Sequence, residues 1–210
     1  MYEQSTNDVI IGIHGIFWAL KNTSRANKNL YATKEGLEEL KKVYKISNKI
    51  LEDLNVEVHI YSTHLFQENA KKIFKEQDLK YMRVPSGVLL TASSLKLRSE
   101  NWIIDQIRSG KKGIKIFCLD QVTDIHNSGA ITRTAAFYGV DALVIASKGS
   151  FGTPPAYFRL AAGAAEIIPL IQSRNLSKFL RRLQEEGVTC IGLSEEKKGE
   201  ISPTDSYLLV

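Results

Sequence analysis

Hydrophobic and polar positions follow two different periods along this chain, and these periods predict its elements. Short aliphatic runs bounded by glycine, proline or aspartate predict buried strands at residues 114–119, 142–146, 167–171 and 189–193. Apolar residues at helical spacing between the strands predict helices at residues 128–138, 154–162 and 176–186. Strands that alternate with helices over short connections favour a parallel sheet covered by helices.

A second group of elements occupies roughly the first 95 residues. After a short strand or turn that leads into a helix near Gly15, the pattern predicts strands at residues 29–33, 56–61 and 87–92. It also predicts helices at residues 35–54 and 63–75, the first with the clearest apolar stripe in the chain. We therefore expect a small α+β domain at 1–95, a linker with one helix at 96–113, and a parallel-sheet domain at 114–210.

Polar side chains follow the first strand of the second domain. Asn127 or Ser128 stands where the cap of the next helix is expected, and Gly139 stands where that helix should end. Ligands bind at the carboxyl edge of open parallel sheets, so Asn127 and Arg133 are candidate site residues. Their six-residue spacing does not place them on one helical face, and by itself it favours a helix cap and a solvated arginine.

Other chemistry-bearing residues have equally ordinary explanations. His126 is a lone histidine in a loop, and such residues are more often structural or solvated than catalytic. Glu166 follows a run of small residues, where an exposed carboxylate at a strand end is the default. Six basic residues would be solvated helix faces unless they cluster in space into an RNA-binding track: Lys71, Lys72, Lys75, Lys178, Arg181 and Arg182.

Composition and charge narrow the function classes. A net charge of +5 and a pI near 9.1 permit an RNA partner. No apolar run is long enough for a membrane span, and the polar amino terminus does not resemble a signal peptide. Cys118 and Cys190 lie far apart in the sequence, each in a predicted strand. This favours core thiols of a cytoplasmic protein over metal ligands or a disulfide. The chain carries no glycine-rich phosphate loop, zinc-ligand spacing or G-x-S-x-G elbow.

A resemblance to one family changes this picture. Residues 119–140, LDQVTDIHNSGAITRTAAFYGV, resemble the first signature motif of the SpoU (TrmH-type) RNA ribose methyltransferases, approximately LD-x-V-x-DPHN-x-GA-x-x-RTA-x-x-x-GV. Ile125 replaces the usual proline, and Ser128 replaces a frequent leucine. Residues 161–169, AAGAAEIIP, are similar to the segment that follows in the family. Residues 13–15 and 85–88 are similar to landmarks of the small ribosomal-protein-like domain that many members carry in front.

The resemblance implies a fold, a reaction and roles for named residues. It implies an α/β methyltransferase domain, knotted in the family, behind a small substrate-binding domain. The reaction would move a methyl group from S-adenosylmethionine to a ribose 2′-hydroxyl of rRNA or tRNA, without a metal. Arg133 and Asn127 would be catalytic, and the family proposal makes the arginine at the Arg133 position the base. Because a guanidinium stays protonated, we expect Arg133 instead to bind an RNA phosphate and orient the hydroxyl, while the Asn127 amide holds Arg133 or the substrate. Contacts to RNA would come from His126, Lys178, Arg181 and Arg182.

Two later motifs of the family do not occur in the 210 residues. They are a G-x-E-x-x-G loop and an IPM…SLNVS segment, which build the knotted cofactor pocket in the family. Residues 207–210, YLLV, look like the strand that leads into the first of them. We therefore expect a carboxyl-terminally incomplete domain, an incomplete knot and no cofactor-binding residues, which also puts the family's homodimer in doubt.

Two functional hypotheses remain open. The first is a SpoU-type enzyme that is truncated or incompletely represented, and the second is a non-catalytic RNA-binding remnant of such an enzyme. A generic nucleotide-binding α/β domain is disfavoured, because no phosphate loop is visible.

Overall fold

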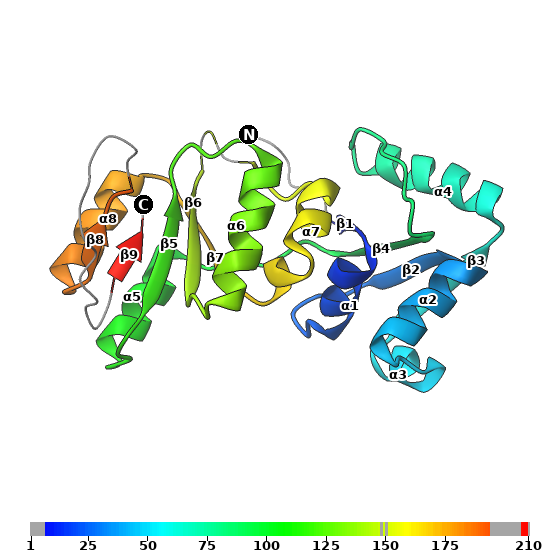
Figure 1. Ribbon diagram of the computed structural model, residues 1–210, viewed down its shortest axis with the longest axis horizontal. Coiled ribbons are helices and arrows are strands. Elements are labelled where there is room, and N and C mark those ends of the chain that lie inside the picture. Colours follow the sequence, from blue (N-terminus) through cyan, green and yellow to red (C-terminus); the bar gives the residue numbers. More distant parts are fainter. Residues whose placement is uncertain (1–6, 148, 150, 194–206, 210) are drawn as a thin grey trace. The chain divides into compact units, whose positions relative to one another are not determined.

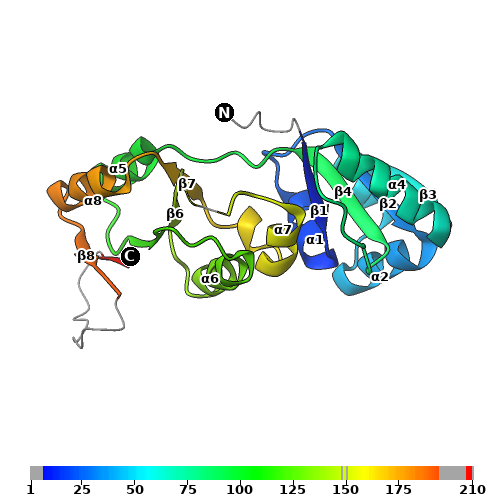
Figure 2. The same ribbon diagram turned by 90° about the horizontal axis from the view of Figure 1, so that it is seen from above.

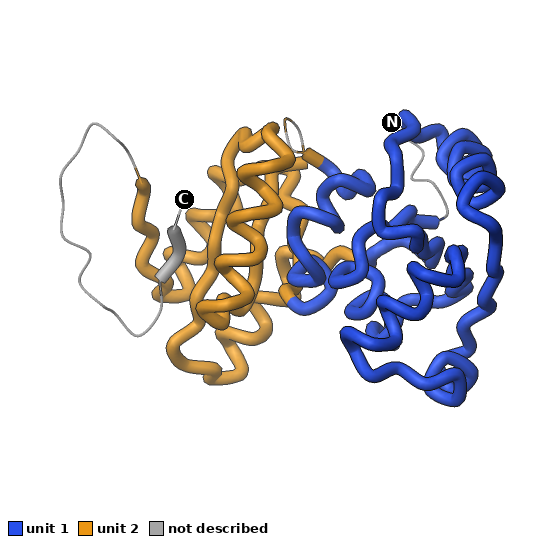
Figure 3. The backbone as a smooth tube through the Cα atoms, turned by 45° about the vertical axis from the view of Figure 1, so that its right-hand side comes forward, with its two compact units in different colours: residues 1–95, 152–167 blue, residues 96–151, 168–210 orange. Residues whose placement is uncertain are grey.

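The computed structural model describes residues 7–147, 149, 151–193 and 207–209. The chain forms two compact units, residues 1–95 with 152–167, and residues 96–151 with 168–210 (Figure 3). The predicted boundary after residue 95 coincides with the division between the units. Residues 152–167, which the sequence placed in the second domain, pack with the first unit instead. The helix of the predicted linker belongs to the second unit.

The first unit is built on a four-stranded mixed sheet (Figure 1). Its strands lie in the order β1-β4-β2-β3, and β4 runs antiparallel to both neighbours while β2 and β3 run parallel. The strands are β1 (Asn7–Ile11), β2 (Lys28–Thr33), β3 (Val56–Tyr61) and β4 (Val88–Ser93). The helical segments are α1 (Ile13–Lys21), α2 (Lys34–Tyr44), α3 (Asn48–Asp53), α4 (Thr63–Glu76), α7 (Pro155–Ala161) and the 3₁₀ turn η1 (Ala164–Glu166).

The prediction of one helix at residues 35–54 is wrong, because the chain breaks between α2 and α3. Lys45 ends α2 in a left-handed conformation with φ of 53°. Ser47 then begins α3, and its side chain accepts a hydrogen bond from the Ile50 backbone N–H. A serine cap and a left-handed residue stop a helix locally, even where the apolar stripe continues in the sequence.

The second unit is built on a five-stranded sheet in which every strand pair is parallel. The order is β7-β6-β5-β9-β8, which confirms the predicted α/β class. The strands are β5 (Lys115–Leu119), β6 (Ala142–Ala146), β7 (Leu170–Ser173), β8 (Thr189–Ile191) and β9 (Tyr207–Leu209), and the helices are α5 (Glu100–Arg108), α6 (Ile125–Phe137) and α8 (Leu176–Glu185). The strand predicted at 167–171 begins only at Leu170, because η1 occupies the residues before it.

Helices cover both faces of this sheet. Figure 2 shows α5 and α8 on one side of β6 and β7 and α6 on the other. Ile116, Cys118 and Val144 pack in one buried cluster with Ile103 of α5 and Phe179 of α8. Strands that are buried on both faces read as continuous aliphatic runs, and this explains why they were visible in the sequence.

Two expectations concern features beyond this architecture. The expectation of an incomplete knot is not tested by the described residues and stays a prediction. Within the part of the chain that the structure describes, no helix has the length and apolar character needed to cross a membrane.

Candidate functional site at the carboxyl edge of the parallel sheet

Three strands of the second unit end side by side and leave polar residues at one edge of the sheet. Neighbouring parallel strands β7, β6 and β5 are followed by Arg174, Ser147 and Asp120 respectively. Gln121 turns the chain after β5 with a left-handed φ of 53°. Because parallel strands share one carboxyl edge, these side chains gather there, and ligands bind at this edge in open parallel sheets.

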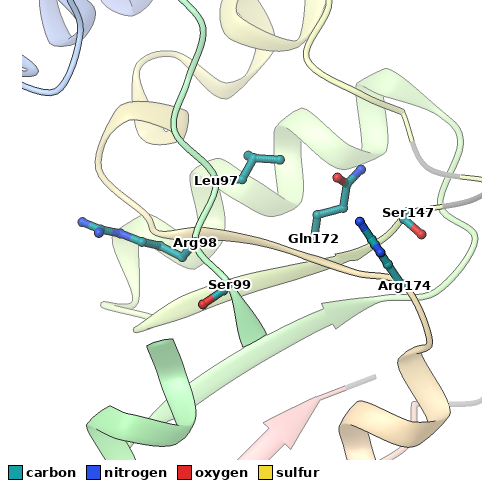
Figure 4. A pocket seen from close by; sticks show the side chains of 6 residues that line it. All are labelled: Leu97, Arg98, Ser99, Ser147, Gln172 and Arg174. Atoms are coloured by element: carbon teal, nitrogen blue, oxygen red, sulfur yellow. The ribbon is translucent and has the colours of Figure 1, made fainter. Parts of the chain in front are cut away.

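The first of two hollows at this edge encloses about 610 Å³ (Figure 4). Residues 97–99 form one wall beside β7, where the Arg98 backbone N–H donates to the Leu170 carbonyl at 2.8 Å. Gln172 in β7 and Arg174, which directly follows the strand, form another wall. The lining residues are Leu97, Arg98, Ser99, Ser147, Gln172 and Arg174.

The second hollow encloses about 350 Å³ and shares Ser147 and Arg174 with the first. It extends toward the end of β5, where Asp120 adds a carboxylate to its lining. The remaining lining residues are Gln121, Ala146, Gly149, Ser173 and Leu176. Arg174 therefore stands between two hollows of different charge. Nothing in the local sequence singled out this arginine, and its place at the edge follows from the strand order.

Three other cations of this unit, Arg108, Lys111 and Arg182, are paired with acids. Arg108 pairs with Glu186 at 2.5 Å, and Lys111 pairs with Asp141 at 2.6 Å. Hydrogen bonding to Arg108 lowers the pKa of the Glu186 carboxyl below its ordinary value. The side chain of Arg174 is exposed and takes part in none of the ion pairs found among the described residues.

Helix α6 begins earlier than the sequence predicted. Asp124 is its cap, and the Asp124 carboxylate accepts a hydrogen bond from the His126 backbone N–H at 2.8 Å. The expectation that Asn127 or Ser128 caps the helix is therefore wrong. Ser128 is buried instead, and its hydroxyl donates to the Asp124 carbonyl at 2.8 Å. The helix ends at Phe137, and Gly139 follows with φ of +63°, in agreement with the predicted stop.

The two predicted catalytic residues are both exposed on α6. Arg133 follows Asn127 by six positions, a rise of about 9 Å along the helix axis. No hydrogen bond joins them among the described residues, and neither lines the two hollows. His126 is also exposed, on the first turn. Within one chain the structure does not bring the predicted catalytic pair to the edge hollows, and its role stays a prediction.

The basic residues predicted to bind RNA on α8 differ in their surroundings. Lys178 and Arg181 are exposed. Arg182 contacts α5, where one amino group lies 3.0 Å from a Glu100 carboxylate oxygen and the other donates to the Asn101 side chain at 2.7 Å. Glu100 also accepts a hydrogen bond from the Ser173 hydroxyl at 2.8 Å. Arg182 therefore holds α8 to α5, which only the packing of the two helices could reveal.

The expectation that Glu166 is an exposed carboxylate at a strand end is wrong. It lies in η1 of the first unit, and its side chain is 2% exposed. Both oxygens of its carboxylate accept hydrogen bonds from the Arg25 guanidinium, and the shortest, from Nη2 to Oε1, is 2.7 Å. The same guanidinium contacts Asp8 at 2.6 Å. Burial raises the pKa of the Asp8 carboxyl above its ordinary value, although Arg25 acts in the opposite direction.

An open parallel sheet with polar hollows at its carboxyl edge defines a ligand-binding α/β domain. Residues 115–207, which contain this sheet from β5 to the start of β9, match the SpoU rRNA methylase family. This part of the chain is similar to members of that family.

Two relatives show how far the similarity extends. The 23S rRNA (guanosine-2'-O-)-methyltransferase RlmB of Shewanella oneidensis is 28% identical over 198 residues, which cover 94% of this chain and 75% of that protein. The protein of the same name from Pseudomonas putida is 33% identical over 131 residues, which cover 62% of this chain and 53% of that protein. Identity is thus higher over the shorter alignment, which spans about half the length of that relative.

Solved structures share the fold over nearly the whole chain. The rRNA methyltransferase from Sinorhizobium meliloti superimposes with a TM-score of 0.66 at 16% identity, covering 99% of this chain and 71% of that one. The SpoU methyltransferase AviRb from Streptomyces viridochromogenes, in complex with its cofactor AdoMet, gives a TM-score of 0.65 at 17% identity. That alignment covers 97% of this chain and 72% of the other.

Proposed function

We propose that this protein is an RNA methyltransferase that transfers a methyl group from S-adenosylmethionine to a ribose 2′-hydroxyl of ribosomal RNA. The observation that carries the proposal is the SpoU match over residues 115–207. Ribosomal RNA is favoured over tRNA because the named relatives act on 23S rRNA. The net charge of +5 supports a polyanionic substrate.

Arg133 and Asn127 are the proposed catalytic residues. Methyl transfer is an in-line displacement in which most of the catalysis is the alignment of two bound partners. A guanidinium keeps its proton and is a poor base, but it can hold a phosphate and a hydroxyl through its planar fork. In this proposal Arg133 orients the attacking ribose, and the Asn127 amide holds Arg133 or the substrate.

A homodimer through α6 would explain why these residues lie away from the hollows of their own chain. Phe137 and Tyr138 at the end of α6 are 83% and 65% exposed, and they extend the side that carries Arg133. Exposed aromatic residues are enriched at protein interfaces. A second copy packed there would cover them and could bring Arg133 to its partner's sheet edge.

The described residues do not fit the whole cofactor. Its adenine and methionine parts need an enclosed pocket, whereas the second hollow is lined mainly by short or polar side chains. The two family motifs that would build such a pocket do not occur in the 210 residues. We therefore assign no residue of this chain to the cofactor. We place the protein in the cytoplasm, supported by the two free thiols, Cys118 and Cys190.

The test is methyl transfer from radiolabelled S-adenosylmethionine to unmethylated ribosomal RNA by the complete gene product. We expect Arg133→Ala and Arg133→Lys each to lower the single-turnover rate by roughly a hundredfold, because positioning is lost. Asn127→Ala should act in the same direction, and non-additively with Arg133→Ala. Arg108→Ala is the matched control, because Arg108 is an exposed arginine whose partner is Glu186, directly after α8.

The result also separates the two hypotheses. Near-unchanged turnover in Arg133→Ala would remove Arg133 from the active site. Absence of transfer together with tight RNA binding would favour the non-catalytic RNA-binding remnant.

A further inference from the structure

We propose that the first hollow is a binding site for one backbone phosphate of the RNA, with Arg174 as its anchor. The inference rests on the proposed function, because it takes RNA as the ligand. It adds a residue, Arg174, that neither the signature motif at 119–140 nor the predicted basic helix contains.

The charges around the sheet are the first argument. Arg108 and Lys111 near the start of β5 have acidic partners, and Arg182 between α5 and α8 has Glu100. Arg174 at the carboxyl edge has no acidic partner among the described residues, and none of the described residues that line the first hollow is acidic. An arginine without an acidic partner in a hollow without carboxylates is a site for an anion.

The donors around Arg174 are the second argument. Figure 4 shows the side chains of Gln172, in β7, and of Arg174, just after it, with the Ser147 hydroxyl nearby. A guanidinium binds a phosphate through two parallel N–H donors, and an amide and a hydroxyl can donate to the remaining oxygens. The Arg98 guanidinium points away from this group and lies 5.5 Å from the centre of the Trp102 ring.

The edge is also held firmly enough to present these donors. The Ser147 backbone N–H donates to the Ser173 carbonyl at 2.8 Å, which ties the end of β6 to the end of β7. Ser173 is buried, and its hydroxyl bond to Glu100 turns it away from the hollow. Its neighbours Gln172 and Arg174 line the first hollow instead.

The second hollow is a poorer place for a phosphate. Asp120 contributes a carboxylate there, and like charges repel at short range in a partly desolvated site. Arg174 borders both hollows, and the Asp120 carboxylate lines only the second. We therefore expect the phosphate in the first hollow, on the side of Gln172.

The experiment measures binding of a short fluorescein-labelled hairpin of ribosomal RNA sequence by fluorescence anisotropy across a salt series. We expect Arg174→Ala to weaken binding about tenfold and to reduce the log–log salt slope by about 1. Arg174→Lys should restore the slope but only part of the affinity, because the charge remains and the fork is lost. Arg108→Ala is the matched control and should leave both quantities nearly unchanged.

A second set of hairpins, each with a single neutral methylphosphonate, identifies the contact. At one position the methylphosphonate should weaken binding to the unsubstituted protein and abolish the effect of Arg174→Ala. Equal effects of Arg174→Ala and Arg108→Ala would overturn the phosphate site while leaving the proposed function standing, provided that methyl transfer persists. The site would also be overturned by an Arg174→Ala effect that no methylphosphonate diminishes. Absence of salt-dependent binding by the unsubstituted protein would overturn both proposals.

Discussion

At the scale of single residues, the role of a side chain in this protein depends on what packs beside it. Arg25 is buried between two carboxylates, Arg182 joins two helices, and Arg174 faces a hollow. Arginine is always charged, so each environment must neutralise it, hydrogen-bond it or leave it for a ligand. Only the last kind of arginine is available to RNA without breaking an internal ion pair.

Cys118 provides a prediction at this scale. Burial raises the pKa of its thiol to about 12, and the nearby Asp120 charge acts in the same direction. At pH 8 the thiolate fraction of Cys118 should therefore be on the order of 10⁻⁴. Because the thiolate is the form that reacts, Cys118 should be alkylated slowly. Iodoacetamide followed by peptide mass spectrometry should label Cys190 well before Cys118 in the folded protein, and both at similar rates in urea.

The pKa shift of Cys118 also has a consequence for stability. Because the folded state holds this proton more tightly than the unfolded state, stability should fall as pH rises from the ordinary thiol pKa of 9.0 toward about 12. Equal labelling rates for the two thiols in the folded protein would contradict the burial of Cys118.

At the scale of elements, the segment at 152–167 is held within the first unit by a buried ionic network. Its Glu166 meets Arg25, which also contacts Asp8 and donates to the Ser93 carbonyl at 2.6 Å. Gly163 approaches α1 so closely that a Cβ there would lie 2.1 Å from the Trp18 ring, and its φ is +91°. Charge and close approach together explain why this segment belongs with β1 and α1 rather than with the strands that flank it in sequence.

This network supports a prediction about stability. Glu166→Gln should lower the free energy of unfolding by about 1–3 kcal/mol, because the buried Arg25 loses one of its two carboxylate partners and keeps only Asp8. Arg25→Met combined with Glu166→Gln should cost less than the sum of the two single changes, because the residues contact each other. Urea denaturation of the four proteins measures both effects, with Arg108→Ala as a control from an exposed pair. Additive losses would show that the two side chains do not act together.

At the scale of the whole molecule, charge is the property that concerns the substrate. The chain carries 28 lysines and arginines against 23 acids, and several of the cations are held in internal pairs. The cations that remain exposed include Lys178, Arg181 and Arg174. Phosphate contacts made by such residues release counterions, which makes affinity fall with salt.

We therefore expect a steep salt dependence of binding to structured RNA. The log–log slope should reach several units, at about 0.7 to 0.9 per phosphate neutralised. Fluorescence anisotropy between low and physiological salt measures it, and Lys178→Ala with Arg181→Ala should reduce the slope further than Arg182→Ala, whose cation is internally paired. An affinity that does not change with salt would rule out a phosphate-based contact.

What the sequence determined by itself is local in origin. Helices α5 and α8, the strands of the parallel sheet and the signature segment were all predicted within a few residues, because periodicity and turn residues act over short separations. The exceptions are equally local: the left-handed Lys45 divided one predicted helix, and Asp124 capped α6 before Asn127 could.

The tertiary structure decided which residues meet. It assigned 152–167 to the first unit, buried Glu166 against Arg25, paired Arg182 with Glu100, and left Arg174 at the sheet edge. Each of these outcomes depends on residues that are distant in the sequence, and burial then changes the energy of every charge involved. An arginine in a sequence carries no mark of its partner, so only the packed chain separates the structural cations from those that can bind a substrate.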